Sequence, residues 1–276
     1  MGTKNTLLNH TLQLNLTGFY YKYTGYQYST DIGLSVVTTN LNTTIAGAEF
    51  ESIWAPVPNL AINANVGYLH TEVDSGANDM SVDPFDVTAG NPNLTALKSI
   101  GDTNCAGSTS GVAEFVGLVD AGILPAAALL TACPTAAAPN GAYAASGLTT
   151  TYGVAKNLTG NQLPTSPNWN VAIGGQYRFM FADWDLTPRV DFHYQSASFG
   201  DIYNDAWDKV PGWVNVNSTL TANVPSQRLQ IQLYVKNLFN SASLTASAVD
   251  GSDVGDIRTA YYLDPRTYGI SITKKF

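Results

Sequence analysis

The sequence is poor in charged residues, and basic residues are the rarer kind. Charged residues make up 12% of its 276 positions, and the formal net charge is -8. A soluble domain carries about twice that share of charged residues. Proteins that follow the phosphates of a nucleic acid need a basic patch, and the sequence contains none. The composition therefore excludes a nucleic-acid partner, and Asn, Thr, Ser and Gln supply most of the polarity.

Cysteine is almost absent, and its two copies do not suit a zinc site. Cys105 and Cys133 lie 28 positions apart in a region rich in Gly, Ala and Ser, with no histidine nearby. This excludes the Cys-x-x-Cys spacing of zinc sites. We predict a disulfide that closes a long loop in an oxidising compartment, and two free thiols are the alternative.

The three histidines are isolated, and no motif of an enzyme is present. His10, His70 and His193 lie on different segments, far from any second ligand or nucleophile in the sequence. The serines lack a nucleophile-elbow motif, and no glycine-rich phosphate loop follows a strand and opens a helix. We therefore predict no catalytic residue, no metal site and no cofactor, in a protein that is not an enzyme.

No stretch of the sequence is typical of a membrane-spanning helix. The most apolar long window, residues 112–133, contains Glu114, Asp120 and Pro125. About 20 predominantly apolar residues are needed to cross a bilayer as a helix. Any membrane crossing must therefore be made by strands, whose backbone groups are satisfied by pairing with neighbouring strands.

The sequence does contain repeated alternation of apolar and polar residues. In residues 168–179 aromatic and aliphatic side chains take every second position except Gly175, and most positions between them are polar. Such alternation predicts a strand with one apolar and one polar face. Seven further segments show it, near residues 10–23, 43–54, 59–73, 184–196, 213–224, 228–239 and 267–276.

The connections between these eight segments alternate between short and long. The tight turns are residues 55–59, 180–184 and 224–227, and the long gaps lie near residues 24–41, 75–166, 198–212 and 240–264. In an antiparallel meander this alternation places all short turns at one end of the sheet and all long loops at the other. Outer-membrane barrels have this asymmetry, with short periplasmic turns and long extracellular loops.

The predicted strands are longer than those of a soluble β-sandwich. They run for about 9 to 13 residues, against about five or six in an average globular strand. At about 3.3 Å per residue and a tilt near 45°, such strands cross an apolar band of about 25 Å. Aromatic residues such as Trp54, Trp169 and Trp184 flank the segments, like the girdles at membrane interfaces. We therefore predict an all-β fold, an antiparallel transmembrane β-barrel portion of about eight strands with long extracellular loops.

Four segments carry motifs that recur together in one family. Residues 45–72 contain a Gly-x-Glu strand, a Pro-containing turn and a Gly-Tyr strand, and residues 163–179 begin a strand with Pro-x-x-x. Residues 229–240 contain Val-x-Asn-Leu-Phe, and residues 265–276 form a closing Pro-Arg-x-Tyr-Gly strand that ends in Phe. In this order they resemble the C-terminal barrel of TonB-dependent outer-membrane receptors. The barrel of that family has about 22 strands, so the resemblance covers about its last third.

The resemblance implies a location and a function. It implies that residues 1–276 form the C-terminal part of a receptor barrel domain in the outer membrane of a Gram-negative bacterium, with 75–166 as a large extracellular loop insertion. The implied function is active uptake of a siderophore, cobalamin, oligosaccharide or similar ligand. The alternative is a passive pore or an adhesive outer-membrane protein without energy coupling.

The resemblance also implies partners. They are outer-membrane lipid, the outer-membrane assembly machinery, an N-terminal plug, and about fourteen further barrel strands. TonB would be contacted only through the plug. We expect the chain to be a C-terminal fragment that is not competent for transport alone.

The closing strand and two loops supply the remaining candidate residues. Tyr268, Ile270, Ile272 and Phe276 form an apolar stripe that resembles the signal read by the assembly machinery. Acidic and aromatic residues in the predicted outer loops are candidates for facing a ligand: Tyr203, Trp207, Asp208, Arg258, Tyr261 and Tyr262. Solvated loops with a few aromatic packing anchors are the alternative, which we favour.

Overall fold

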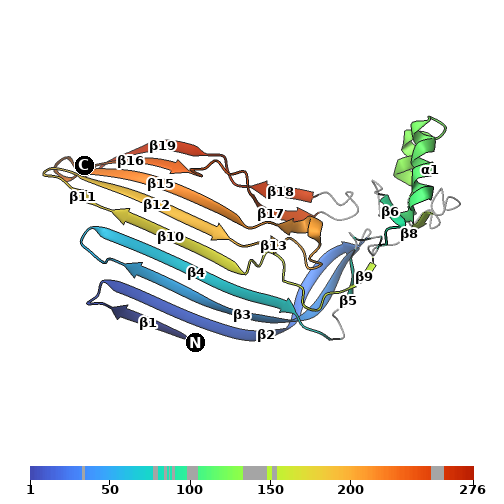
Figure 1. The fold of residues 1–276 in the computed structure, drawn as a ribbon, viewed down its shortest axis with the longest axis horizontal. Helices are drawn as coiled ribbons and strands as arrows, with labels where there is room; N and C mark the ends of the chain where they lie inside the picture. Colours follow the sequence, from blue (N-terminus) through green and yellow to red (C-terminus); the bar gives the residue numbers. More distant parts are fainter. Residues whose placement is uncertain are drawn as a thin grey trace.

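The computed structural model describes residues 1–32, 35–76, 80–83, 86, 88, 91–97, 105–132, 148–150, 154–249 and 258–276. The largest sheet that these residues form is antiparallel; this main sheet spans Figure 1 from blue to red. Its strands lie in the order β1 (Gly2–Leu7), β2 (Leu12–Ile32), β3 (Ser35–Trp54), β4 (Leu60–Val73), β10 (Trp169–Tyr177), β12 (Asp185–Gln195), β15 (Trp213–Val224), β16 (Leu229–Lys236) and β19 (Thr267–Lys274), with β11 (Phe179–Met180) paired to β12. The main sheet is therefore a meander in chain order.

Smaller elements lie towards the right of Figure 1, beyond the long-loop end of the main sheet. They are the pairs β5 (Met80–Asp83) with β9 (Val154–Asn157), β13 (Ser198–Phe199) with β14 (Lys209–Val210) and β17 (Leu244–Val249) with β18 (Arg258–Tyr262), the three-stranded sheet β6 (Leu94–Leu97), β7 (Cys105–Ser108) and β8 (Leu148–Thr150), the helix α1 (Thr109–Asp120), and the short helices η1 (Ala126–Thr131) and η3 (Ala206–Asp208). None of the helices among the described residues is long and apolar enough to cross a membrane.

Four short connections lie at one end of the main sheet, at the left of Figure 1. They are residues 8–11, 55–59, 181–184 and 225–228, the last containing η4 (Pro225–Gln227). The turns after β1 and β3 each use a residue with positive φ, Asn9 at 51° and Asn59 at 70°, where Asn is tolerated better than most residues. The three predicted tight turns are confirmed and lie at the same end of the sheet, whereas the strict alternation with long loops fails at 24–41.

Two predictions about the first third of the chain are wrong. The expected loop at 24–41 is mostly strand, because β2 and β3 continue to Ile32 and from Ser35 as one long hairpin. The ladder shifts register once, between Thr24 and Tyr26, where Gly25 has a φ of 78°. That conformation suits glycine and forms a bulge without ending the strand. A ninth strand on the path, β1, was also missed, because its sequence does not alternate.

The register of the ladders keeps the two faces of the main sheet separate. Phe50 of β3 pairs with Val66 of β4, which pairs with Val171 of β10, and Val171 pairs with Tyr194 of β12. All four side chains lie on one side, the apolar face, because cross-strand partners in an antiparallel ladder point to the same side. The other apolar rows continue in the same way, although two of them include a serine, Ser52 opposite Ala64 and Ser218 opposite Val190, and the positions between form the polar face. The predicted assignment of faces is confirmed.

Pro188 lies where the ladder is broken. The pairs between β10 and β12 end at Gln176 with Arg189, and pairing resumes at Phe179 with Leu186 in the same register. Pro188 falls in this interval and has no amide hydrogen to donate. Pro188 of β12 therefore lies opposite the gap between β10 and β11, and on its other side it stays in register with Leu220 of β15.

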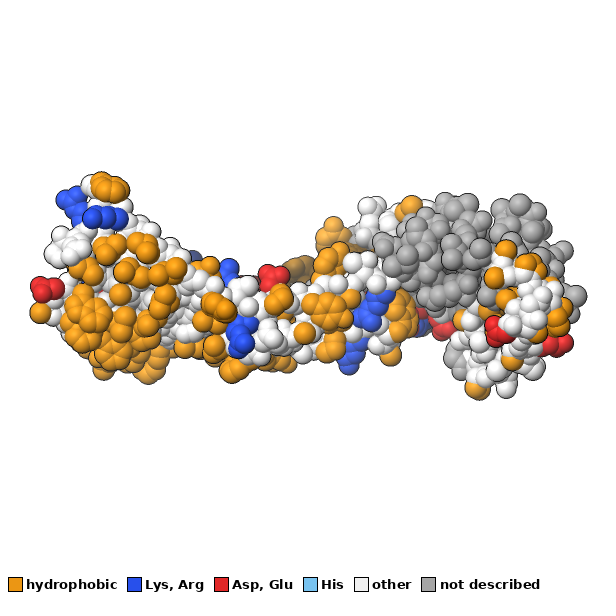
Figure 2. Space-filling model, turned by 90° about the horizontal axis from the view of Figure 1, so that it is seen from above, with side chains coloured by type: hydrophobic (Ala, Val, Ile, Leu, Met, Phe, Trp, Pro, Cys, Tyr) orange, Lys and Arg blue, Asp and Glu red, His pale blue; other side chains and the backbone are white. Residues whose placement is uncertain are grey.

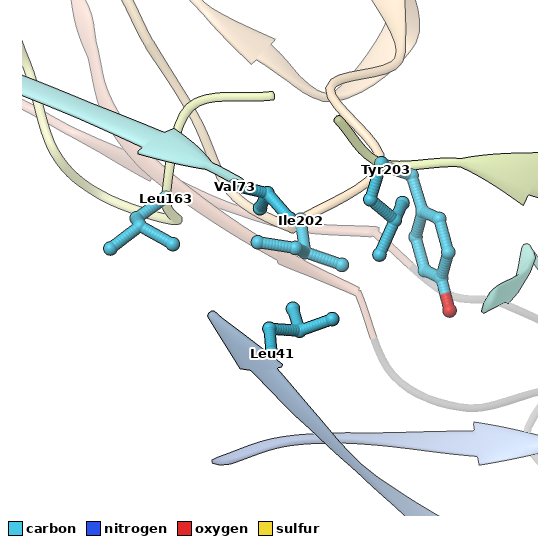
Figure 3. Close-up of a cluster of buried hydrophobic side chains, with 6 residues drawn as sticks. Leu41, Val73, Leu163, Ile202 and Tyr203 are labelled. Atoms are coloured by element: carbon cyan, nitrogen blue, oxygen red, sulfur yellow. The ribbon is translucent and has the colours of Figure 1, made fainter. Parts of the chain in front are cut away.

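A small apolar core fastens the long β2–β3 hairpin to the connections beside it. Leu41 of β3 and Val73 of β4 are buried against Leu163, Ile202 and Tyr203, which lie in the connections after β9 and β13 (Figure 3). Tyr28 of β2 packs edge-on against Tyr203 with ring centroids 6.2 Å apart. The hairpin and the connections therefore form one packed unit, called the outer cap below.

Leu41→Ala tests whether this core holds the outer cap. Leu41 has no exposed surface, so its truncation leaves a cavity worth about 2–5 kcal/mol. We expect limited proteolysis and amide exchange to become faster in the segment 198–210, while the ladder between β12 and β15 stays protected.

The matched control is Leu8→Ala, because Leu8 is 63% exposed in a turn at the opposite end of the main sheet. Its exchange pattern should equal that of the unchanged chain. Equal behaviour of the two variants would contradict the role of Leu41.

Candidate functional site

The polar face of the main sheet is organised around one arginine. Arg189 of β12 donates from Nε to Asp191 Oδ2 at 2.9 Å and from Nη1 to Gln176 Oε1 at 3.2 Å. Its Nη2 donates to Asn63 Oδ1 at 2.9 Å and to Asp191 Oδ1. One guanidinium thus connects β4, β10 and β12 through charge-assisted hydrogen bonds. We call these four side chains the Arg189 junction.

Gly174 has no side chain and so leaves space for the side chains of the Arg189 junction. A Cβ placed on Gly174 would meet Arg189 Nη2 first and would lie 2.6 Å from both Asn63 Oδ1 and Asp191 Oδ1, so the ends of these side chains would have to shift. Its neighbour Gly175 points to the apolar face and has nothing within 4 Å of such an atom. Only the first of these two glycines is therefore required by packing.

The polar face also contains a second network near the short-turn end. Asp185 accepts from Arg178 Nη2 at 2.6 Å and from Asn223 Nδ2 at 2.9 Å. Gln230 donates to Asn223 Oδ1 at 2.9 Å, which extends the network to β16. These hydrogen bonds satisfy polar side chains for which the interior of a bilayer offers no partner.

A cavity of about 350 Å³ opens on the same polar face. Its lining residues are Gln13, Asn15, Glu51, Ser52, Ile53, Asn63 and Asn65. Asn15 donates to Glu51 Oε2 at 3.2 Å, but its own Oδ1 is buried without a hydrogen-bond partner. The cavity is therefore lined almost entirely by polar side chains.

The predicted ligand-facing residues separate into two groups. Tyr203 and Asp208 are 1% and 0% exposed and belong to the interior of the outer cap. Trp207, Arg258, Tyr261 and Tyr262 are exposed. Tyr203 is an aromatic packing anchor, in agreement with the alternative interpretation for this residue. A ligand-facing role for the exposed residues stays a prediction.

Asp208 supports the connection between β13 and β14. Its Oδ2 accepts from the backbone N of Asp201 at 2.6 Å, and its Oδ1 accepts from Ser247 Oγ of β17 at 2.7 Å. Gly200 lies against this carboxylate, since a Cβ there would meet Asp208 Oδ1 at 2.7 Å. Sequence reasoning missed this role, because an aspartate in a polar connection is indistinguishable from a solvated one.

Asp83, Asp201, Asp205 and Asp208 are buried or half-buried acids near the outer cap, and two of them, Asp83 and Asp205, share Lys156. Lys156 of β9 bridges Asp83 at 3.2 Å and Asp205 at a shorter distance. Asp201 accepts from the backbone N of Tyr203 at 2.7 Å through Oδ1, while its Oδ2 is buried without a partner. Burial, followed by the charges of Asp208, Asp205 and Asp83, raises the pKa of Asp201 to about 7.

These acids do not form a metal site. Among the described residues, no group of three or more His, Cys, Asp or Glu is placed to hold a metal ion. Cys105 lies in β7, but Cys133 lies outside the described residues, so the disulfide stays a prediction. His70 is 3.3 Å from Glu72, and His193 faces Asn170 at 2.9 Å.

The closing strand lies at an edge of the main sheet. Tyr268, Ile270 and Ile272 of β19 are 80%, 59% and 64% exposed on the apolar face, and Phe276 is fully exposed. β19 pairs with β16 on one side, and no described strand pairs with its other side. The predicted stripe is present, and its recognition by assembly machinery stays a prediction.

Comparison with known proteins is informative only at the level of structure. No protein-family model and no curated protein matches the sequence. The ferric yersiniabactin uptake receptor FyuA from Yersinia pestis matches 98% of the chain with a TM-score of 0.58 at 15% identity. The siderophore receptor PiuA from Acinetobacter baumannii matches 98% with a TM-score of 0.54 at 14% identity. The unliganded ferric citrate transporter FecA matches 99% with a TM-score of 0.52 at 15% identity.

The chain has the fold of a part of the barrel of TonB-dependent outer-membrane receptors. It spans 28%, 27% and 30% of the lengths of FyuA, PiuA and FecA. The predicted antiparallel barrel portion is confirmed for the fold, and the predicted outer-membrane location agrees with these neighbours. The predicted domain boundaries stay predictions.

Gly174→Ala tests the Arg189 junction. The added methyl group must displace Asn63 or Asp191, and overpacking of this kind costs about 1–3 kcal/mol. We expect a lower urea midpoint for the purified chain in detergent. Gly175→Ala is the control, because the same change on the apolar face meets nothing. Similar midpoints for both variants would show that the junction tolerates the methyl group.

The pKa of Asp201 predicts a pH dependence of the outer cap. Its pKa is about 7 in the folded chain and 3.8 as an ordinary carboxyl, so the folded state binds this proton more tightly. The stability of the outer cap should therefore fall as pH rises from about 4 to about 7, and change little above that range.

Amide exchange in the segment 198–210, measured at pH 5 and pH 8, checks this prediction. Exchange corrected for its intrinsic pH dependence should be faster at pH 8 in the unchanged chain. Asp201→Asn should abolish the difference, because the amide cannot ionise. A difference that persists in Asp201→Asn would assign the effect to another group.

Proposed function

We propose that the chain forms part of the wall of an outer-membrane receptor barrel for active, TonB-dependent uptake of a ligand. The observation that carries the proposal is the in-register separation of an apolar face from a hydrogen-bonded polar face across the main sheet. Figure 2 shows hydrophobic side chains gathered at the left end of the molecule, which is the short-turn end in Figure 1. Lipid suits the first face, and a watery or plugged interior suits the second.

Aromatic pairs mark two levels along β10 and its neighbours. Tyr68 and Trp169 lie with ring centroids 4.8 Å apart at the long-loop end, and Tyr177 and Phe179 lie 4.7 Å apart at the short-turn end. The ten residue steps from Trp169 to Phe179 span about 33 Å along a strand, or about 25 Å at a tilt near 40°. This matches the height of the apolar band of outer-membrane barrels.

The direction of the edge strands argues for a wider barrel. Nine strands lie on the hydrogen-bonded path from β1 to β19. Because each strand reverses direction, β1 and β19 run the same way and would form a parallel pair if joined. A closed antiparallel barrel therefore needs an odd number of further strands between these two edges. We propose that such strands complete a barrel of receptor size.

Transport is proposed as a property of the completed receptor. The ligand would be a siderophore, cobalamin, an oligosaccharide or a similar molecule, and an N-terminal plug inside the barrel would connect it to TonB. The proposal assigns this chain the wall, its polar lining and the outer cap, and no catalytic activity. The chain alone offers an open sheet with two edges, which does not enclose a path.

Arginine substitutions on the two faces of β16 test the membrane orientation. Leu233 is on the apolar face and Gln232 is on the polar face. In lipid vesicles, Leu233→Arg should lower the free energy of unfolding by about 2–4 kcal/mol, because the charge enters the apolar band. Gln232→Arg should cost about 1 kcal/mol or less. Equal costs, or a chain that stays monomeric in buffer without lipid, would overturn the proposal.

The energy coupling has a separate test. Radiolabelled ferric siderophore uptake should be compared in cells that carry the complete receptor gene, with and without TonB. Uptake that requires TonB supports the proposal, whereas uptake or ion conductance independent of TonB would establish the passive pore instead.

A further inference from the structure

Three basic side chains gather at the end of the hairpin formed by β16 and β19. Arg228 ends the turn before β16, Lys274 is the last residue of β19, and Lys275 follows it. The backbone N of Lys275 donates to Arg228 O at 3.1 Å, which holds the two segments together. All three residues are exposed at the short-turn end of the main sheet, and Figure 2 shows basic side chains beside the hydrophobic ones at this end. We call Arg228, Lys274 and Lys275 the basic corner.

A cavity of about 270 Å³ opens at the basic corner. Its lining residues are Asn223, Pro225, Arg228, Leu229, Gln230, Thr273 and Lys275. Gln230 and Thr273 are cross-strand partners on the polar face, whereas Leu229 belongs to the apolar row and pairs with Lys274. The cavity therefore lies where the two faces meet at the end of the sheet, and we call it the corner cavity.

The polar wall of the corner cavity is held in place by hydrogen bonds. Gln230 Nε2 donates to Asn223 Oδ1 at 2.9 Å, and Asn223 Nδ2 donates to Asp185 Oδ1 at 2.9 Å. The backbone N of Arg228 donates to Pro225 O at 3.0 Å, which closes the turn before β16. The lining is therefore preorganised for a ligand.

The charge of the basic corner is not balanced by neighbouring acids. No carboxylate is among the lining residues of the corner cavity. Asp185, which reaches the lining through Asn223, already accepts from Arg178 Nη2 at 2.6 Å. Within the described part of the chain, none of the three cations takes part in an ion pair. Even with an α-carboxylate on Phe276 the group keeps a net positive charge, so it attracts an anion.

The basic corner lies where the apolar face ends. Ile272 is the last aliphatic residue of the row on β19, and Lys274 follows it by two residues, or about 7 Å along the strand. In the turn between β11 and β12, at the same end of the sheet, Phe181 and Trp184 stack with ring centroids 4.3 Å apart, and aromatic residues are enriched at membrane interfaces. The stem of Lys274 thus follows apolar surface while its ammonium reaches the headgroup region.

The donors of the basic corner suit a phosphate group. A guanidinium binds phosphate through two parallel hydrogen bonds, and ammonium and hydroxyl groups add further donors. A phospholipid brings such a phosphate together with acyl chains, for which the row of Leu233, Ile270 and Ile272 offers 48%, 59% and 64% exposed side chains. A free phosphate ion gains nothing from this row, so the combination of the two surfaces favours the lipid.

We propose that the basic corner binds the phosphate of an anionic phospholipid in the leaflet at the short-turn end, with its acyl chains along the exposed row of β16 and β19. The proposal rests on the membrane orientation proposed above. In this arrangement a charged contact, in addition to the apolar band, sets the depth of the β16–β19 hairpin in the bilayer.

Native mass spectrometry of the purified chain, released from neutral detergent micelles, tests the proposal. The chain is titrated with phosphatidylglycerol, with phosphatidylcholine, whose headgroup has no net charge, and with inorganic phosphate. We expect saturable binding of phosphatidylglycerol, about tenfold tighter than that of phosphatidylcholine, and no binding of inorganic phosphate. The preference should shrink as the ionic strength rises, because salt screens exposed charges.

Substitutions in the basic corner assign the binding to its charges. Arg228→Gln, Lys274→Gln and Lys275→Gln should each weaken the binding of phosphatidylglycerol about fivefold, which is the effect of one basic residue near an anionic membrane surface. Lys275→Arg keeps the charge and should keep the affinity. Lys236→Gln is the matched control, because it removes the same charge from an exposed lysine at the long-loop end of β16, and it should leave the affinity unchanged.

Three outcomes would overturn the proposal. They are equal affinity for the two phospholipids, an equal loss of affinity in Lys236→Gln and the corner variants, and saturable binding of inorganic phosphate without a preference for phosphatidylglycerol.

The arginine variants of β16 in vesicles separate this outcome from failure of the proposed function. A chain that passes the membrane test but binds both phospholipids equally refutes the phospholipid site alone. A chain in which both faces tolerate arginine equally refutes the membrane orientation.

Discussion

Cross-strand register is the constraint on which the rest of this structure depends. A shift by one residue would move every side chain of a strand to the other face of the main sheet. The polar face around Arg189 would then receive apolar side chains, namely Phe50, Val66, Val171 and Tyr194. Asn63, a hydrogen-bond partner of Arg189, would lie on the face directed to lipid. The apolar rows and the Arg189 junction therefore depend on the same ladders, and Gly174 is the position beside the junction that carries no side chain.

The faces and turns of the main sheet could be predicted because the membrane-spanning segments obey period-two alternation. β1 was missed because Gly2, Lys4 and Thr6 alternate with Thr3 and Asn5 before Leu7, so neither face is apolar. The outer half of the β2–β3 hairpin was missed for a related reason. Beyond the lipid band both faces are polar or aromatic, and hydrogen bonding to a neighbouring strand leaves no hydrophobic signal in the sequence.

The outer cap was beyond sequence reasoning because its interior joins distant segments. Leu41, Leu158 and Ile202 come from three parts of the chain, and nothing local distinguishes them from exposed residues. The same is true of Asp201 and Asp208, whose burial follows from packing against Ser247 and Tyr203. Composition identified the acidic and aromatic character of these connections, but it gave no sign of which side chains turn inward.

The unbroken β2–β3 hairpin also has a mechanical consequence. A ladder of backbone hydrogen bonds runs from the apolar rows at Leu12 and Trp54 to the outer cap at Tyr28 and Leu41, with a single bulge at Gly25. A continuous ladder resists bending within its plane, so force applied to the outer cap is carried into the wall with little loss. The hairpin is therefore a stiff connection between the outer cap and the wall.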